Sequence, residues 1–288
     1  VLLEEGKQAQ TQVIVLISIV ILGSCLGNLS QTALNAMFSG MAADFGVQME
    51  LGQWVTTLYM LVLGITVPVV TYLTRRFPLK NVVLAALSLL VVGAAVDAIA
   101  PSFEVLVAGR ALQAVSAGIT MPMMISIVMT SFPRDKQATV MGITGIAMGF
   151  APNIGPTIGG WMIGFAGWRS FFVALFTCTL VLLLLAAVLI ARRPQVDSSA
   201  RLDGLSLLLS ALGFGGLLLG FSNASSFGLA SPYIWAPAIL GVLFLALYLR
   251  RQKHIEHPLT NLHIFDSWRY RVSFWASNAL YASFMGIT

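Results

Sequence analysis

Residues 204–249 read GLSLLLSALGFGGLLLGFSNASSFGLASPYIWAPAILGVLFLALYL, and this stretch contains no charged side chain. One helix that crosses a hydrocarbon layer needs about 20 mostly apolar residues, so the stretch is long enough for two crossings. Its centre, residues 222–232 (SNASSFGLASP), is rich in the small and turn-forming residues of a connection. We therefore predict two membrane helices joined by a turn.

The composition of the whole chain agrees with a membrane protein. Of its 288 residues, 58% are hydrophobic and only 9% are charged, whereas soluble domains have about 25% charged residues. The high hydrophobicity also excludes a disordered chain. The net charge of +5 comes from short basic clusters between apolar runs, so it does not indicate nucleic-acid binding. Cys25 and Cys178 lie inside apolar runs and predict neither a disulfide framework nor a metal site.

Six further apolar runs precede the quoted stretch. They lie between residues 7 and 44, between 50 and 75, between 80 and 99, from 104 onward around Arg110, between 136 and 169, and between 169 and 192. Together they predict eight membrane helices, and residues 272–288 begin a ninth. Because the chain begins with Val1 and ends inside an apolar run, we expect a fragment that is truncated at its C-terminus.

The basic residues set the predicted orientation. If the N-terminus lies in the cytoplasm, all but two of the 16 Lys and Arg residues fall on the cytoplasmic side, as the positive-inside rule requires. The outer side then receives mainly Asp44, Glu50 and Glu104. We predict a multi-pass protein of the cell membrane with a cytoplasmic N-terminus. Of the two exceptions, Arg169 follows Trp168 and is interpreted as an interfacial anchor.

The other exception, Arg110, lies inside the fourth predicted helix. It is about six residues past Glu104, or roughly 9 Å along the helix. A charge at this depth either faces a bundle interior or a wet cavity, or extends to the outer surface. Asp97, in the third helix, lies four residues before Pro101. It either pairs with Arg110 across the short turn or forms a solvated helix end.

Polar side chains follow one face of the first predicted helix. They are Ser24, Asn28, Gln31, Thr32 and Asn35. Lipid penalises such a face, so it must contact protein or water. The face forms either interhelical hydrogen bonds or the polar wall of a transport cavity. The fourth helix repeats the pattern with Arg110 and Gln113, and two such helices in one bundle favour the cavity.

The fifth predicted helix contains GITGIAMGFAPNIGPTIGGWMIG, residues 142–164. Glycines four residues apart let a second helix backbone approach closely, and the two internal prolines remove backbone donors and bend the helix. The chain has no phosphate-binding loop, which argues against ATP hydrolysis. His254, His257 and His263 have a spacing that a metal site could use, but a solvated linker is the preferred interpretation.

Four segments carry a resemblance to a known family. The fifth helix supplies the first of them through Gly145, Gly149, Gly155, Pro156, Gly159 and Gly160. The other three are LVAGRALQAVSAG around Arg110 and Gln113, QWVTTLYML from Gln53, and HPLTNLHIF from His257. With these segments the chain resembles the major facilitator superfamily, and within it the 14-helix drug:proton antiporters of multidrug efflux.

Two positions depart from the pattern of that family. In the loop after the second helix, TYLTRRFPLK, Thr71, Arg75 and Pro78 stand where the family usually has Gly, Asp and a second Gly. Ser30 stands where the first helix of the family often has an acidic residue.

The resemblance implies an all-α membrane bundle of six plus six helices with two inserted helices. Residues 1–198 would form the N-terminal six-helix bundle and residues 199–252 the two inserted helices. Residues 253–288 would hold a cytoplasmic linker and the start of the ninth helix, which opens the C-terminal bundle. The substrate would bind near the membrane midplane between the two bundles.

The function implied by the resemblance is proton-driven export of amphipathic or cationic drug-like molecules by alternating access. The proton gradient would drive it, with no cofactor or metal. The partners would be the lipid bilayer, the small-molecule substrate and protons, with no nucleic acid. The protein would be monomeric, with or without accessory efflux proteins.

The implied roles of individual residues fall into three groups. Arg110 would organise the proton or substrate path. A polar cavity would be lined by Asn28, Gln31, Asn35 and Gln113. The glycines of the fifth helix would form the contact between bundles, and the cytoplasmic gate would be held by Arg75, Arg76 and Lys80.

Three alternatives stay open from the sequence. The first is a uniporter or symporter for a nutrient, and the glycine-rich fifth helix argues against it. The second is a membrane receptor or scaffold that transports nothing. The third is a membrane-embedded enzyme, which the lack of paired intramembrane carboxylates or histidine clusters disfavours. The chain is therefore expected not to be an enzyme.

Overall fold

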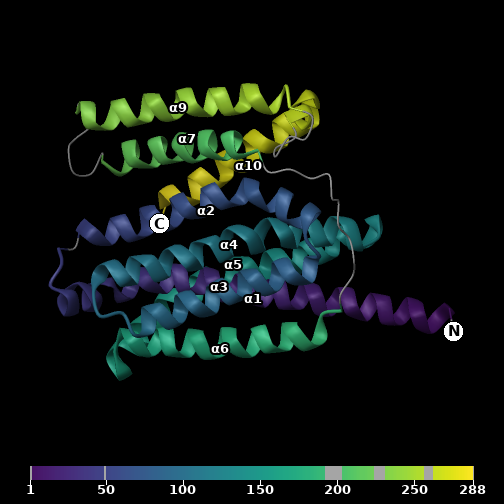
Figure 1. The fold of residues 1–288 in the computed structure, drawn as a ribbon, viewed down its shortest axis with the longest axis horizontal. Helices are drawn as coiled ribbons and strands as arrows, with labels where there is room; N and C mark the ends of the chain where they lie inside the picture. The colour runs from purple at the N-terminus through teal and green to yellow at the C-terminus, as the bar shows by residue number, and fades with distance from the viewer. Residues whose placement is uncertain (1, 49, 192–202, 224–230, 256–261, 288) are drawn as a thin grey trace.

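The computed structural model describes residues 2–48, 50–191, 203–223, 231–255 and 262–287 (Figure 1). Within these ranges every regular element is helical. The elements are α1 (Leu2–Phe45), α2 (Glu50–Arg76), α3 (Leu79–Ala98), α4 (Phe103–Ser131), α5 (Arg134–Ala166), α6 (Trp168–Leu189), α7 (Gly204–Ser222), α9 (Pro232–Gln252), the short 3₁₀ helix η1 (Leu262–Asp266) and α10 (Trp268–Ile287).

Eight helices of the described part of the chain, α1 to α7 and α9, are long and apolar enough to cross a membrane. They occupy the runs predicted from the sequence. α7 ends at Ser222 and α9 begins at Pro232, at the two ends of the predicted turn. The centre of that turn lies outside the described residues. α10 is helical where the ninth helix was predicted to begin, although it is not one of the eight.

Local chemistry explains where several of these helices begin and end. Pro78 and Pro133 directly precede α3 and α5, in keeping with the preference of proline for helix starts over helix interiors. Gly167 alone joins α5 to α6, with a φ of 77°. Only glycine adopts this φ without strain, so a one-residue turn at this point depends on it.

The first six helices form one bundle (Figure 1). α1 and α4 contact each other, and each also packs on several neighbours: α1 on α5 and α6, and α4 on α2 and α3. α6 covers one side of the bundle, whereas α2 lies on the opposite side and carries α7. α9 packs on the outer side of α7. The two helices predicted as an insertion therefore form a hairpin docked on α2.

Two large apolar clusters form most of the core of the bundle, beside a small one around Tyr59. One includes Val20, Val83 and Met123, and the other includes Met37 and Phe172. Along α1 and α4, the residues of the two clusters are separated by a short buried polar stretch. Ser30, Arg110 and Gln113, which are described below, lie in this stretch.

An ion pair closes one end of the α7–α9 hairpin. Arg251 donates to both carboxylate oxygens of Asp203 at 2.7 and 3.1 Å, and Gln252 donates to Ser206 at 2.6 Å. The hydrogen bonds from Arg251, with further ones from Ser206, lower the pKa of Asp203 from its ordinary value of 3.8 to about 2. The carboxylate is therefore ionised at any physiological pH.

The interior of the hairpin depends on close backbone contact. A Cβ atom at Gly216 would lie 2.6 Å from the carbonyl oxygen of Pro237 and 2.8 Å from the Cα atom of Gly241. Small residues allow membrane helices to approach in this way. At the end of α7, the hydroxyls of Ser222 and Thr57 in α2 lie 3.2 Å apart.

The predicted boundary between residues 198 and 199 lies outside the described residues. The boundary after residue 252 coincides with the end of α9. The division of the chain into three domains stays a prediction.

Candidate functional site

Arg110 is at the centre of a buried polar cluster. Its side chain is 2% exposed, and its Nη1 atom donates to Ser30 Oγ at 2.7 Å and to Gln113 Oε1 at 2.6 Å. Ser30 also donates to the same Gln113 oxygen at 3.0 Å. Because Gln113 lies one turn after Arg110 on α4 while Ser30 belongs to α1, the cluster joins the two helices inside the bundle.

Gln113 extends this cluster to a carboxyl group on a third helix. Its Nε2 atom donates to Asp97 Oδ2 at 2.7 Å, and Asp97 in α3 is 0% exposed. An arginine offers only donors and a carboxylate only acceptors, so the Gln113 amide must turn its oxygen toward Arg110 and its nitrogen toward Asp97. The amide therefore links a buried cation to a buried anion.

Tyr59 of α2 completes the surroundings of the cation. The Cζ atom of Arg110 lies 4.8 Å from the centre of the Tyr59 ring, which is within cation–π range. Tyr59 is itself buried, and its hydroxyl has no hydrogen-bond partner among the described residues. Four helices, α1 to α4, thus contribute to one polar site.

The structure settles the alternatives left open for Arg110 and Asp97. Arg110 faces the bundle interior and does not extend to the outer surface. Asp97 is buried and linked to Arg110 through Gln113, so the solvated helix end is wrong for this residue. A buried charge pair of this kind inside a membrane bundle is costly unless it is fully paired, and such pairs mark functional pathways.

The three amides predicted for the first helix lie on another face of α1. Asn28 Nδ2 lies 3.9 Å from the sulfur of Met148 in α5, and Gln31 Nε2 lies 3.7 Å from that of Met60 in α2. Ser30 is about 200° around the helix from Asn28 at 100° per residue. It therefore faces α4, whereas Asn28 approaches α5 and Gln31 approaches α2.

Asn35, the third of these amides, lines a cavity of about 580 Å³ between α1, α2 and α7. The structure thus separates the five predicted path residues into two groups. Arg110 and Gln113 meet in the buried cluster and contact α1 through Ser30. The amides of α1 lie elsewhere, and their role in a transport path stays a prediction.

The glycines of α5 also divide into two groups. A Cβ at Gly155 would overlap the hydroxyl of Thr32 and lie 2.9 Å from the carbonyl oxygen of Leu29. A Cβ at Gly159 would lie 2.8 Å from the carbonyl oxygen of Ala33. Both glycines therefore pack on α1 within the same bundle, and their predicted contact with another bundle stays a prediction.

The remaining members of the glycine pattern face open space. Apart from its chain neighbours and the backbone of α5, no described atom lies within 4 Å of a Cβ placed at Gly145, Gly149 or Gly160, and Pro156 is exposed. For these positions a contact with another bundle stays a prediction.

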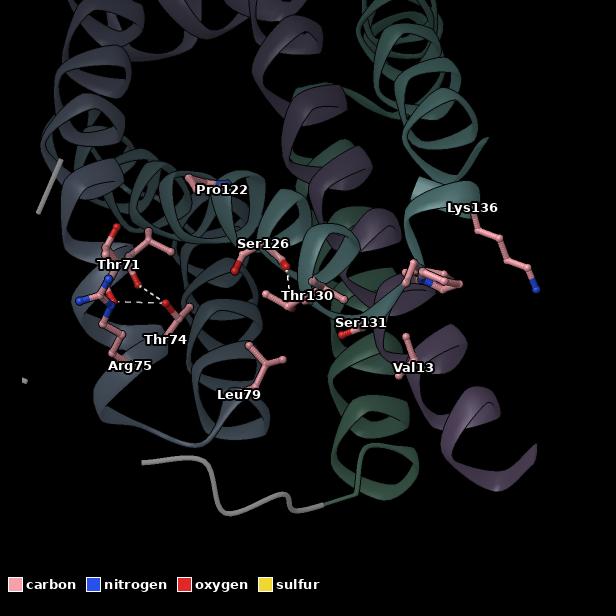
Figure 2. A pocket seen from close by; sticks show the side chains of 14 residues that line it. Val13, Thr71, Thr74, Arg75, Leu79, Pro122, Ser126, Thr130, Ser131 and Lys136 are labelled. Atoms are coloured by element: carbon pink, nitrogen blue, oxygen red, sulfur yellow. Dashed lines mark hydrogen bonds between the residues drawn. The ribbon is translucent and has the colours of Figure 1, made fainter. Parts of the chain in front are cut away.

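One residue of the predicted cytoplasmic gate, Arg75, borders a cavity of about 870 Å³. Figure 2 shows Arg75 at the end of α2 on one side and Lys136 at the start of α5 on the other, with Ser126 and Thr130 of α4 between them. Lys136 extends away from the cavity. Hydroxyl groups therefore border an opening at this end of the bundle, with Arg75 at its edge.

The other two predicted gate residues lie apart from this opening. Lys80 donates to the carbonyl oxygen of Ala187 at 2.6 Å. Ala187 lies near the C-terminal end of α6, and the partial negative charge at a helix C-terminus attracts a cation. Arg76 is half-buried at the last position of α2 and does not line the cavity. Only Arg75 of the three contacts the large opening.

Arg169 lies at the opposite end of the bundle. It forms an ion pair with Asp44 at 2.9 Å and donates to the carbonyl oxygen of Ala100 at 3.2 Å. Its Cζ atom lies 4.2 Å from the centre of the Trp168 ring. The residue thus ties α1 and the turn after α3 to the start of α6, and its role as an interfacial anchor stays a prediction.

The described residues contain no group of three His, Cys, Asp or Glu side chains that could hold a metal ion. His254 Nδ1 lies 2.8 Å from the carbonyl oxygen of Arg250. His257 lies outside the described residues.

Comparison with known proteins identifies the family. A family model described as the Major Facilitator Superfamily matches residues 20–247, and the chain belongs to this family. It is a multi-span membrane protein of this type, and its bundle is the major facilitator fold.

Two relatives in Bacillus subtilis are more than one-third identical to the chain. The uncharacterised MFS-type transporter YcnB is 36% identical over 87% of this chain and 53% of its own length. The lincomycin resistance protein LmrB is 35% identical over 87% of this chain and 52% of its own length. A multidrug resistance protein B homolog of Mycobacterium tuberculosis is 29% identical over 86% of this chain and 46% of its own length. The chain therefore spans about half the length of these relatives.

Solved structures support the fold independently of sequence. A crystal structure of a peptide transporter, POT, in complex with sulfate superimposes with a TM-score of 0.61 at 14% identity. The match covers 88% of this chain and 54% of the other. At this identity the likeness concerns the fold alone.

Sequence reasoning missed several members of the buried cluster. Asp97 was considered either as a partner of Arg110 or as a solvated helix end, Ser30 only as a departure from the family pattern, and Tyr59 not at all. The available signal was a pair of glycines, Gly93 and Gly109, placed beside the charged residues of α3 and α4. The contact between the two glycines depends on the angle and position at which α3 and α4 cross, and the sequence of either helix alone does not determine this crossing.

Proposed function

We propose that the full-length protein exports amphipathic or cationic drug-like molecules in exchange for protons, by alternating access. Membership of the major facilitator superfamily supports transport as the class of activity. The names of the lincomycin and multidrug resistance relatives support drug-like substrates. The direction of transport and the use of protons are the parts that this proposal adds.

The observation that carries the proposal is the buried cluster around Arg110. Its charges lie inside a bundle whose helices are long and apolar enough to cross a membrane. Ionisable side chains at such positions line ion pathways and proton relays far more often than they serve packing. Arg110 would therefore organise the path, with Gln113 as its direct partner.

We also propose an orientation in the membrane, an oligomeric state and a driving force. The N-terminus would lie in the cytoplasm of a cell membrane, and the opening beside Arg75 would then face the cytoplasm. The protein would act as a monomer, with or without accessory efflux proteins, and the proton gradient would be its only driving force.

Dye export from cells tests this function. Cells that produce the full-length protein and are loaded with ethidium should lose the dye faster than control cells, and a proton uncoupler should abolish the difference. Arg110→Ala should reduce export to the background rate, whereas Arg169→Ala, the matched surface arginine, should not. Export that is unchanged in Arg110→Ala at equal expression would remove this residue from the mechanism. A nutrient symporter would instead show no ethidium export at all.

A further inference from the structure

Asp97 occupies a site that is shaped around its carboxyl group. A Cβ atom at Gly109 on the facing helix α4 would overlap Asp97 Oδ1 and lie 2.9 Å from its Cγ. A Cβ at Gly93, one turn before Asp97, would lie 2.7 Å from both the Cγ of Gln113 and the carbonyl oxygen of Gly109. The two glycines thus leave room for the carboxyl group and for its amide partner, and for little else.

The two oxygens of this carboxyl group are not equivalent. Oδ2 accepts the hydrogen bond from Gln113, whereas Oδ1 has no hydrogen-bond partner among the described residues. Oδ1 is therefore the position at which a proton can be added without breaking the bond to Gln113. A proton on Oδ2 would instead face the Gln113 NH₂ group, donor against donor.

Arg110 supplies the positive charge that interacts with Asp97. Arg110 belongs to α4, and the ring of Tyr59, which belongs to α2, covers its guanidinium group. α1 contributes the uncharged hydroxyl of Ser30. While Asp97 is ionised, the cluster is therefore electrically balanced.

No other described cation takes over this role. From α6, Arg169 reaches the carbonyl oxygen of Ala100 near the end of α3, but it is engaged by Asp44. Lys80 lies at the opposite end of α3, where it donates to a backbone carbonyl oxygen of α6. The exposed Glu104 begins α4 and adds no positive charge.

Asp97 lies close to water despite its burial. α3 ends at Ala98, and the next residue, Ile99, is 78% exposed. A proton thus has only about one helical turn to cross from that end of the bundle. In the proposed orientation this end is the outer one, from which protons enter during export.

We propose that Asp97 is a proton-binding site of the transport cycle, and that its protonation and the binding of a cationic substrate exclude each other. This inference rests on the proposed export function and identifies its proton site. A hydronium ion at the end of α3 transfers its proton to Asp97 Oδ1 and leaves as water. The cluster then changes from balanced to a net charge of +1, carried by Arg110.

This change of charge provides the coupling. A buried cation without a partner is strongly unfavourable, so a second cation in the same bundle is repelled once Asp97 is neutral. Loss of the proton restores the balance and makes room for the substrate. Gln113 holds Asp97 and Arg110 in fixed relation during both steps because its two hydrogen bonds do not involve Oδ1.

Infrared difference spectra of the purified full-length protein at high and low pH test the proton site without requiring transport. The wild type should gain the C=O band of a protonated carboxyl group at low pH. Asp97→Asn should lose this band, whereas Asp44→Asn, the matched surface carboxylate, should keep it. If the same band persists in Asp97→Asn, the proposal is overturned. Should that variant not fold, Asp97→Glu must shift the band, and an unshifted band overturns the proposal equally.

Ethidium binding at different pH tests the exclusion. The apparent Kd of the wild type should rise by up to about tenfold for each unit of falling pH, as competition between a proton and a ligand requires. That of Asp97→Asn should not change with pH. A pH-dependent Kd in Asp97→Asn would overturn the coupling. A wild type that binds no ethidium at any pH would count against the proposed drug export and the exclusion, while the infrared bands still decide the proton site.

Discussion

Gly93 of α3 and Gly109 of α4 meet in direct backbone contact. A Cβ on Gly93 would lie 2.7 Å from the carbonyl oxygen of Gly109, and a Cβ on Gly109 would lie 3.0 Å from the carbonyl oxygen of Gly93. The contact brings the two helices close enough for Gln113 to reach Asp97. The geometry of the buried cluster thus depends on the absence of two side chains.

Gly93→Ala should therefore destabilise the bundle. The added methyl group meets a backbone atom that cannot move alone, and overpacking of this kind costs about 1–3 kcal/mol. Thermal unfolding of the purified protein in detergent should show a lower Tm. Gly160→Ala is the matched control, because its Cβ meets open space. Equal Tm values for both variants would contradict the close contact.

Gly159→Val should separate α5 from α1. Its Cβ would lie 2.8 Å from the carbonyl oxygen of Ala33 and 3.2 Å from the Cγ of Met37. We expect membrane insertion to continue but ethidium export to fall to background, because the helix contact is lost. Gly160→Val, on the neighbouring open position, should retain the fold, as measured by resistance to protease. Loss of folding in Gly160→Val alone would reverse the assignment of the two faces.

The fold could be predicted from the sequence because a hydrocarbon layer constrains it strongly. A membrane helix must satisfy its backbone internally and needs a long apolar run, so uncharged runs such as residues 204–249 already indicate the helices. The composition thus located all eight spanning helices of the described chain. Proline inside helices, such as Pro122 in α4, did not mislead the prediction.

The site could be predicted only in part. Arg110 and Gln113 are one turn apart on one helix, so periodicity brings them together. Ser30 and Asp97 join them through contacts between helices, and small rotations decide these contacts. Ser30 is uncharged and lies outside the conspicuous stripe of amides on α1, so the stripe did not indicate the contact with α4.

The ion pair of the α7–α9 hairpin should resist acid. The pKa of Asp203 is lowered to about 2 by hydrogen bonds from Arg251 and Ser206. A lowered pKa means that the pair stabilises the folded state fully above the ordinary value of 3.8 and loses this effect as the pH falls from about 4 through about 2. The Tm difference between wild type and Asp203→Asn should therefore be constant from about pH 8 to pH 5 and shrink only below about pH 4.

Arg250→Gln serves as the control for that series, because it removes the neighbouring exposed arginine and leaves the ion pair intact. Its Tm difference from wild type should not follow the same acid profile. A difference for Asp203→Asn that already changes between about pH 7 and pH 5 would contradict the lowered pKa.

Arg169→Gln should have only a small effect on stability. The side chains of Arg169 and Asp44 are 43% and 50% exposed, and exposed ion pairs contribute about 0–1 kcal/mol. Stacking on Trp168 adds a similar amount. We expect the variant to have a slightly lower Tm than the wild type. Because salt screens the ion pair, raised salt should lower the Tm of the wild type more than that of the variant. A loss of folding would show that the anchor does more than join exposed groups.

Arg110→Lys tests whether the cluster needs a guanidinium or only a positive charge. A lysine keeps the charge but lacks the flat group that stacks on Tyr59 while it bonds to Ser30 and Gln113. Loss of one hydrogen bond to a charged group costs about 1.5–3 kcal/mol, so initial ethidium export should fall roughly tenfold or more at equal expression. Arg169→Lys, the same change at the exposed anchor, should export at the wild-type rate. If Arg110→Lys also does so, charge alone suffices and the bonded geometry has no part in transport.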